Sequence, residues 1–213
     1  DMVIGGTDTT STMVEWTMAE LLQNPNAMEK VKEELDQVIG QNKIVEESDL
    51  PKLRYLDAVI KETFRLHPPL PLLIMRCPKL HYLDATIKLG GFTIPKGSNV
   101  YLNVWAIHRD PKYWENPLEF DPHRFLISTR FDYSGCNTNF LPFGSGRRGC
   151  PGGVPLGEKM LMHVLASLLH SFHWILPNGK QHELSDKFGL VVKKRNPLLA
   201  IPSQRLPNKN LYM

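Results

Sequence analysis

Cysteine is scarce in this sequence. Three of its 213 residues are Cys, namely Cys77, Cys136 and Cys150, and no two of them have the Cys-x-x-Cys spacing. An odd number of widely spaced cysteines argues against a disulfide framework and against a zinc ribbon. Isolated cysteines of this kind are usually small buried hydrophobic residues or free thiols.

Long apolar runs and one-sided charge are also missing. The sequence has no uninterrupted run of about 18 apolar residues and no signal-peptide pattern, so it predicts no membrane-spanning segment. Its formal net charge of +3 is not gathered into a basic tail, so we expect no nucleic-acid partner. The proportions of hydrophobic residues (42%) and charged residues (22%) are those of an ordinary globular protein.

The segment GGTDTTSTMVEW, residues 5–16, places two glycines and four threonines ahead of an apolar pattern typical of a helix. Glycine and threonine are poor helix formers, and Thr12 and Glu15 have the spacing of a capping box. Taken alone, the segment predicts a loop followed by a helix that begins at Thr12. The apolar residues just before it, Met2 to Ile4, suggest a segment from the interior of a longer protein.

Three further helices are expected from apolar residues at helical spacing. The first runs from Pro25 to about Gly40, and the second from Pro51 to about Leu66. The third follows Gly153, and six residues form its expected apolar stripe: Leu156, Met160, Leu161, Val164, Leu168 and Phe172.

The middle and the tail of the chain predict short strands and a long irregular segment. Residues 86–94 resemble a hairpin closed by Gly90-Gly91. Further short strands are expected at residues 100–102, 190–192 and 198–201. Residues 110–142 show no periodicity, and an irregular run of that length inside a compact domain is usually functional.

A glycine-rich sequence surrounds the third cysteine. In FGSGRRGCPG, residues 143–152, arginines and the start of a following helix would stabilise the thiolate form of Cys150, which is the form that binds metals. Glycines would let a flat, bulky group approach the backbone. The phosphate-loop alternative fails because no Gly-Lys-Ser/Thr follows. A simple turn carrying an inert cysteine remains the other interpretation of these residues alone.

The order of four motifs resembles the cytochrome P450 family. They are GGTDTT, then Glu62-x-x-Arg65, then FDPHRF at residues 120–125, then the Cys150 motif; each of the middle two alone indicates little more than a surface ion pair or a turn. The phrases LHPPLPLL, NVWAIHRDP and KFGLVVKK resemble plant microsomal members. The resemblance implies a mainly α fold with small β-sheets (α+β), with residues 1–213 forming the C-terminal portion of a single domain, from the oxygen-binding helix onward.

The resemblance also implies a haem site. Cys150 would be the axial thiolate ligand of the iron, and Arg148 and Arg76 would pair with haem propionates. The implied cofactor-binding set is Phe143, Gly146, Arg148, Cys150, Gly152 and Arg76.

Three other groups of residues acquire roles by the same resemblance. Asp8 and Thr9 would be the acid–alcohol pair that delivers protons during oxygen activation. Glu62, Arg65 and Arg124 would form a buried charge triad. The residues expected to contact a lipophilic substrate are Gly5, Leu72, Leu73, Phe188 and Gly189. On this interpretation residues 5–10 lie within a long helix rather than before its start.

The implied function is that of a haem-thiolate monooxygenase. It would insert one atom of O2 into a terpenoid or phenylpropanoid, with electrons from NADPH delivered by NADPH-cytochrome P450 reductase. The family resemblance places such an enzyme on the cytosolic face of the endoplasmic reticulum membrane, through an N-terminal anchor absent from this chain. Two alternatives stay open: a haem-containing hydroperoxide dehydratase or lyase that needs no reductase, and an inactive truncated product.

Two positions depart from the usual family pattern. His123 stands where Glu is most common, which leaves its local pairing open. The segment from Cys150 to Gly157 is one residue longer than the usual Cys-x-Gly-Ile-Pro-Leu-Ala, and Gly153 is the expected extra residue. One added residue would turn the start of the next helix by about 100° unless the loop absorbs it.

Overall fold

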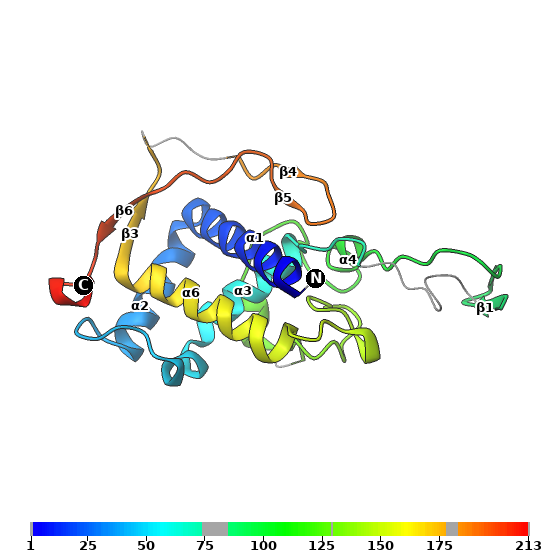
Figure 1. Cartoon of the computed structure of the whole chain (residues 1–213), viewed down its shortest axis with the longest axis horizontal. Helices are drawn as coiled ribbons and strands as arrows, with labels where there is room; N and C mark the ends of the chain where they lie inside the picture. Colours follow the sequence, from blue (N-terminus) through cyan, green and yellow to red (C-terminus); the bar gives the residue numbers. More distant parts are fainter. Residues whose placement is uncertain (1, 74–84, 129, 178–182, 213) are drawn as a thin grey trace.

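The computed structural model describes residues 2–73, 85–128, 130–177 and 183–212. Helices dominate these residues (Figure 1). They are α1 (Met2–Gln23), α2 (Pro25–Val38), η1 (Glu47–Lys52), α3 (Arg54–Leu66), α4 (Val104–Ile107), α5 (His123–Ile127), η3 (Gly146–Arg148), η4 (Gly153–Gly157), α6 (Glu158–Ser171) and η6 (Lys209–Tyr212). None of the described helices is both long and apolar enough to cross a membrane.

The strands of the described residues form three two-stranded antiparallel sheets. The hairpin expected at residues 86–94 is confirmed: β1 (Ile87–Leu89) pairs with β2 (Phe92–Ile94) across Gly90-Gly91, and both glycines have positive φ. Figure 1 shows this hairpin standing away from the helices. The other sheets pair β3 (Phe172–Ile175) with β6 (Ile201–Gln204) and β4 (Asp186–Lys187) with β5 (Lys193–Lys194).

The other strand predictions were wrong in position. Residues 100–102 contain no strand beyond an isolated bridge at Val100, and the strands expected at 190–192 and 198–201 are displaced toward β5 and β6. The reason is pairing: β6 takes the register set by β3, with Ile175 opposite Ile201, and short strands follow their partner more than their own propensity.

Helix α1 passes without interruption through the glycine- and threonine-rich segment. The interpretation of residues 5–10 as helix interior is confirmed, and Thr12 lies ten residues inside the helix rather than at its start. The hydroxyls of Thr7 and Thr9 donate to the carbonyls of Val3 and Gly5, each at 2.7 Å. Hydroxyls bonded in this way occupy positions inside a helix without interrupting it, and α1 continues to Gln23.

The helix expected from Pro51 to Leu66 is divided in the structure. Residues 47–52 form the short turn η1, and α3 starts only at Arg54. Glu34 of α2 causes the new start, because its carboxylate accepts the backbone N–H groups of Tyr55 and Leu56 at 2.6 and 2.9 Å. A carboxylate at this place satisfies the free N–H groups of a helix N-terminus. The helix beginning at Pro25 is confirmed as α2, with Pro25 in its first turn.

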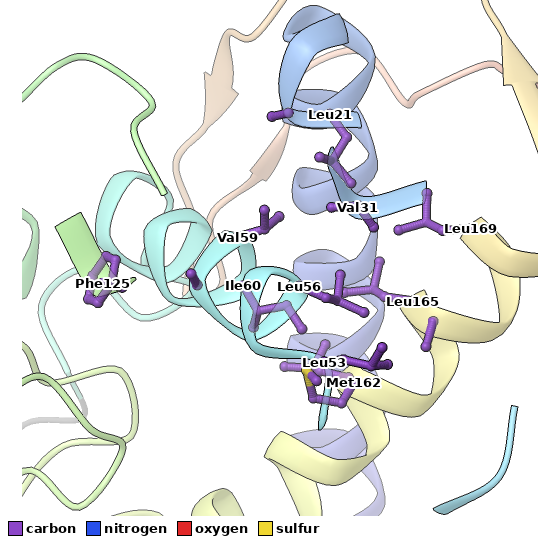
Figure 2. Close-up of a cluster of buried hydrophobic side chains, with 14 of the residues drawn as sticks. Leu21, Val31, Leu53, Leu56, Val59, Ile60, Phe125, Met162, Leu165 and Leu169 are labelled. Atoms are coloured by element: carbon purple, nitrogen blue, oxygen red, sulfur yellow. The ribbon is translucent and has the colours of Figure 1, made fainter. Parts of the chain in front are cut away.

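A single apolar core joins α1, α2, α3 and α6 (Figure 2). Leu21, Val31, Leu56 and Leu165 are each fully buried within it. Burial of a side chain of this size contributes about 1.5–3 kcal/mol relative to exposure. The core therefore holds α3, the helix that carries Glu62 and Arg65, rigidly against α6, the helix that follows the cysteine loop.

The stripe expected for the last helix was wrong in part. Leu161 is buried as expected, but Leu156, Met160 and Val164 are exposed. The residues of α6 that face the core are Leu161, Met162, Leu165, Ala166, Leu169 and His170. The helix is apolar over more than half of its circumference, so periodicity alone does not select the face that packs.

Candidate functional site

The loop before α6 folds back on itself around Cys150. The backbone N–H of Cys150 donates to the carbonyl of Phe143 at 2.8 Å, and that of Gly149 donates to the carbonyl of Gly146 at 3.0 Å. Gly144 and Gly146 take φ values of 76° and 66°, which side chains other than glycine rarely adopt. The glycines thus permit a tight turn that leaves Cys150 exposed at its tip.

An aromatic cluster anchors this loop to the core. The Phe143 ring lies 5.2 Å from Phe64 and 5.7 Å from Tyr133, between ring centroids. The Tyr133 hydroxyl donates to Asp57 of α3 at 3.0 Å, and burial raises the pKa of that phenol. These contacts connect the cysteine loop directly to α3.

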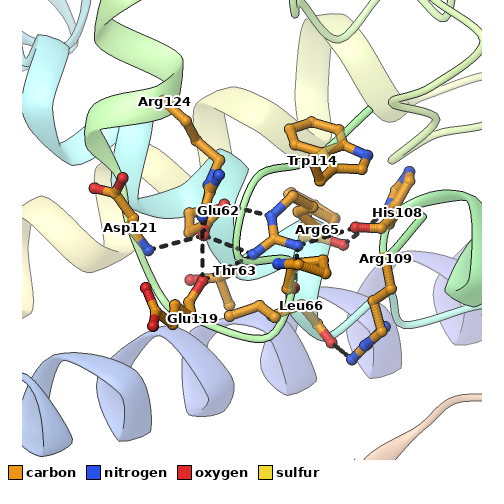
Figure 3. A network of polar contacts seen from close by, with 12 residues as sticks. Glu62, Thr63, Arg65, Leu66, His108, Arg109, Trp114, Glu119, Asp121 and Arg124 are labelled. Atoms are coloured by element: carbon orange, nitrogen blue, oxygen red, sulfur yellow. Dashed lines mark hydrogen bonds and ion pairs between the residues drawn. The ribbon is translucent and has the colours of Figure 1, made fainter. Parts of the chain in front are cut away.

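Glu62, Arg65 and Arg124 meet in a buried charge network (Figure 3). Two nitrogens of Arg65 donate to the two oxygens of Glu62, at 2.7 and 2.8 Å, and Arg124 adds a third contact at 3.1 Å. The side chains of Glu62 and Arg65 are 0% exposed. Burial raises the pKa of Glu62, while its hydrogen bonds from Arg65 oppose that shift.

Arg65 also organises the irregular segment that follows α4. Its guanidinium donates to the carbonyls of His108, Pro117 and Glu119 at 3.0, 2.6 and 2.9 Å. The Asp121 N–H donates to Glu62 at 2.8 Å. A segment without regular secondary structure thereby has its backbone groups satisfied by one ion pair on α3, which explains how an aperiodic run stays ordered.

The structure adds a residue that sequence reasoning missed. His108 is fully buried; its Nδ1–H donates to the Phe64 carbonyl at 3.3 Å and its Nε2 accepts the Leu141 N–H at 2.8 Å. One imidazole therefore links the end of α3 to the residues that lead into the cysteine loop. The available signal was the phrase NVWAIHRDP, which places this His beside an Arg-Asp pair, but nothing local reveals its partners.

Contacts from the tail of the chain hold α1. The Trp16 indole donates to the Val192 carbonyl at 3.2 Å and stacks on His67 with centroids 3.9 Å apart. Closer to the start of α1, Lys193 forms an ion pair with Asp8 at 2.5 Å. Thr9 is half-buried, and its hydroxyl donates to the Gly5 carbonyl rather than to Asp8.

A groove of about 470 Å³ runs between α1, α6 and the tail. Val14, Met18, Leu168, Trp174 and Leu198 supply most of its apolar wall. None of the five residues expected to contact substrate lines it. Those residues are Gly5, Leu72, Leu73, Phe188 and Gly189, of which Phe188 is 73% exposed.

A family model described as "Cytochrome P450" matches residues 1–201. The chain belongs to the cytochrome P450 family. It is 51% identical over 213 residues to cytochrome P450 76C1 of Arabidopsis thaliana, covering 99% of this chain and 40% of that protein. It is 45% identical over 209 residues to an iridoid oxidase of Catharanthus roseus, covering 97% and 39%, and 46% identical over 205 residues to a geranylhydroquinone 3''-hydroxylase of Arnebia euchroma, covering 95% and 40%.

A solved structure of a zebrafish cytochrome P450 with abiraterone matches the fold. Its TM-score is 0.83 at 36% identity, and the match covers 96% of this chain and 45% of that chain. The expected mainly α fold with small sheets is thereby confirmed. The chain spans about two-fifths of the length of the curated relatives that it matches.

The P450 loop around Cys150 fits a haem. A Cβ added to Gly146 or Gly152 would meet no atom within 4 Å, so open space lies beside the backbone of both glycines in the loop of the exposed cysteine. A flat macrocycle needs such space to reach a thiolate closely. Among the described residues no group of three or more His, Cys, Asp or Glu side chains could hold a separate metal ion.

Arg76 lies outside the described residues, and of Arg148 the structure describes the backbone, in η3. His123, which replaces the common Glu, has found a partner: Lys30 lies 2.8 Å from its Nε2. The departure at position 123 therefore leaves the contact between α2 and α5 in place, and Arg124 still reaches Glu62.

His108 leads to a prediction about pH. Burial lowers its pKa from 6.5 to about 3, so below about pH 6.5 the unfolded chain binds a proton that the folded chain does not. Stability should then fall by up to about 1.4 kcal/mol per pH unit as the pH drops. We expect the unfolding free energy of the full-length protein to decrease between pH 7.5 and 5.5, as measured by urea denaturation.

A His108→Gln variant is the matched control, because its amide can donate and accept but does not titrate in this range. It should show a shallower decline than the original protein. Equal slopes for the two proteins would contradict the assignment to His108. The buried His67, whose pKa is also lowered by burial, accounts for a remaining slope in both.

Proposed function

We propose that the full-length protein is a haem-thiolate monooxygenase that hydroxylates a lipophilic small molecule. The observation that carries this proposal is the exposed Cys150, held on a glycine-rich loop that is anchored to the buried core through Phe143. On this proposal the chain forms part of one P450 domain, and electrons come from NADPH through a separate reductase at the endoplasmic reticulum membrane.

Residues of the glycine-rich cysteine loop, together with Arg76, would hold the haem. Cys150 would ligate the haem iron, and a haem bound in this way supplies the redox chemistry that splits dioxygen. Arg148 and Arg76 would bind the propionates, and the bare backbone of Gly146 and Gly152 would admit the ring.

Asp8 and Thr9 would bring protons to the opposite face of the site. Asp8 is 40% exposed on its side chain and is held by Lys193, so water can reach it. The Thr9 hydroxyl, which donates to Gly5 here, can turn to accept from or donate to a water molecule. An alcohol beside a solvated carboxylate is suited to passing protons one at a time.

A terpenoid is the substrate class that we propose. Two relatives, at 45% and 46% identity, are named as an iridoid oxidase and a geranylhydroquinone hydroxylase, and both names denote terpenoid-derived substrates. Gly5, Leu72, Leu73, Phe188 and Gly189 are small or apolar, which suits a ligand that offers little hydrogen bonding.

Turnover of the full-length protein in reductase-containing microsomes tests the proposal. We expect hydroxylation of monoterpene alcohols that requires both NADPH and O2, with one labelled oxygen atom incorporated from ¹⁸O2. Conversion of a fatty-acid hydroperoxide without NADPH would instead identify a dehydratase or lyase. The isolated 213-residue chain, which spans about two-fifths of the length of its relatives, is expected to be inactive in the same assay.

A further inference from the structure

The segment between the cysteine and α6 contains a helical turn of unusual width. In η4 (Gly153–Gly157) the N–H of Gly157 donates to the carbonyl of Gly152 at 2.8 Å, and the N–H of Glu158 donates to that of Gly153. Both bonds span five residues rather than four, which is the spacing of a π-helical turn. A turn closed in this way encloses one residue more than an α-helical turn.

Gly153, the residue expected to be extra relative to the family pattern, is the first residue of this turn. Helix α6 begins at Glu158, and its buried face is continuous from Leu161 through Leu165 to Leu169. The helix therefore keeps its packing against the core. A π turn at η4 can take up the expected rotation of the helix start, about 100°, before the first residue of α6 that contacts the core.

The Phe143 ring packs against the backbone of the π turn. A Cβ placed on Gly153 would lie 2.6, 2.7 and 2.9 Å from Cγ, Cδ1 and Cβ of Phe143, which is a severe overlap. A Cβ placed on Gly157 would lie 3.4 and 3.6 Å from Cε1 and Cζ of the same ring, which is ordinary contact. The base of the ring thus rests directly on the backbone of the residue that widens the turn.

We propose that Gly153 is a positioning residue for the Cys150 thiolate. Phe143 is its intermediary: the ring is wedged between η4 and Phe64, while the carbonyl of the same residue accepts the Cys150 N–H at 2.8 Å. A side chain at position 153 must displace the ring, and displacement of the ring shifts the carbonyl that holds the cysteine. The inference rests on the proposed function for its meaning, since it concerns the placement of the haem ligand.

Two glycine-to-alanine variants of the full-length protein form the test. Gly153→Ala should raise the rate of haem loss to a scavenging globin roughly tenfold or more. In the spectrum of the reduced protein with carbon monoxide, it should also convert much of the band to the form seen without a thiolate ligand. Gly157→Ala adds the same methyl group to the same turn, beside the same ring, and should leave both measurements unchanged.

A double variant separates displacement of the ring from general misfolding. Phe143→Ala removes Cγ and Cδ1, the two atoms that the new methyl group would approach most closely, so Gly153→Ala should have much less further effect in a Phe143→Ala background. This comparison still applies if Gly153→Ala alone yields no folded protein, because the double variant should then fold about as well as Phe143→Ala alone.

Three results would overturn the inference: wild-type haem retention in Gly153→Ala, equal damage in Gly157→Ala, or no relief in the double variant. The unsubstituted protein reports separately on the proposed function. If it shows no thiolate-type spectrum, the function fails, whereas the effect of each added methyl group can still be measured by thermal unfolding of the unsubstituted protein and the four variants.

Discussion

A Cys150→Ser variant of the full-length protein should lose all NADPH-dependent turnover. It should also lose the thiolate-type band in the spectrum of the reduced protein with carbon monoxide. Serine is a near isostere, but its hydroxyl does not ionise near neutral pH and cannot donate charge to iron as a thiolate does. The backbone around Cys150 is held by the N–H donated to Phe143 and by the turn at Gly146, and neither uses the sulfur. The fold of the loop should therefore survive.

Cys136→Ser is the matched control for this experiment. Cys136 is also a free, exposed cysteine close to the same loop in sequence, but it lies outside the glycine-rich motif of residues 143–152. Its spectrum and turnover should equal those of the unsubstituted protein. A thiolate-type band that persists in Cys150→Ser, or that disappears in Cys136→Ser, would contradict the assignment of the ligand.

The second large effect is expected from Glu62→Gln. The substitution preserves shape but removes the charge that pairs with Arg65 and Arg124, leaving the fully buried Arg65 uncompensated. Loss of one partner of a buried ion pair typically costs about 3–5 kcal/mol. Because Arg65 also holds the carbonyls of His108, Pro117 and Glu119, the irregular segment should loosen as well.

Thermal unfolding and haem content of the purified full-length protein measure this effect. Both should fall sharply in Glu62→Gln. In Glu47→Gln, which breaks the exposed pair with Lys159, no measurable change is expected. Arg65→Lys should resemble Glu62→Gln, since lysine cannot reproduce the paired donors that meet Glu62 and three carbonyls. Normal stability in Glu62→Gln would show that the network contributes little to the fold.

Local signals predicted some elements well and others poorly. The Gly90-Gly91 hairpin and α2 were correctly placed, because turn glycines and a proline in a first helical turn act through the backbone of their own residues. The start of α3 was misplaced, because it depends on Glu34, a residue about twenty positions earlier. The prediction of the buried face of α6 was partly wrong for a related reason. In a helix that is apolar on most sides, contacts with neighbouring elements decide which side is buried.

The residues of the candidate site also fall into two groups, those that the sequence indicates and those that only the fold reveals. Cys150, Glu62 and Arg65 could be singled out because they belong to the ordered family motifs, although Glu62-x-x-Arg65 alone indicates little more than a surface ion pair. His108 could not, because its two hydrogen-bond partners lie 44 and 33 residues away. The groove between α1, α6 and the tail is likewise lined by residues far apart in the chain.

The sequence by itself determined the family and the order of its motifs, and it singled out the cysteine that we propose as the haem ligand, because these depend on residue identity at short range. Only the tertiary structure decided how an extra glycine is accommodated, which atoms satisfy the buried Arg65, and how the Cys150 loop is fixed to the core. Those outcomes depend on contacts between distant residues. A Phe143 ring that rests on Gly153 leaves no periodic pattern in the sequence, whereas in the folded chain it joins the cysteine loop to the helix that follows.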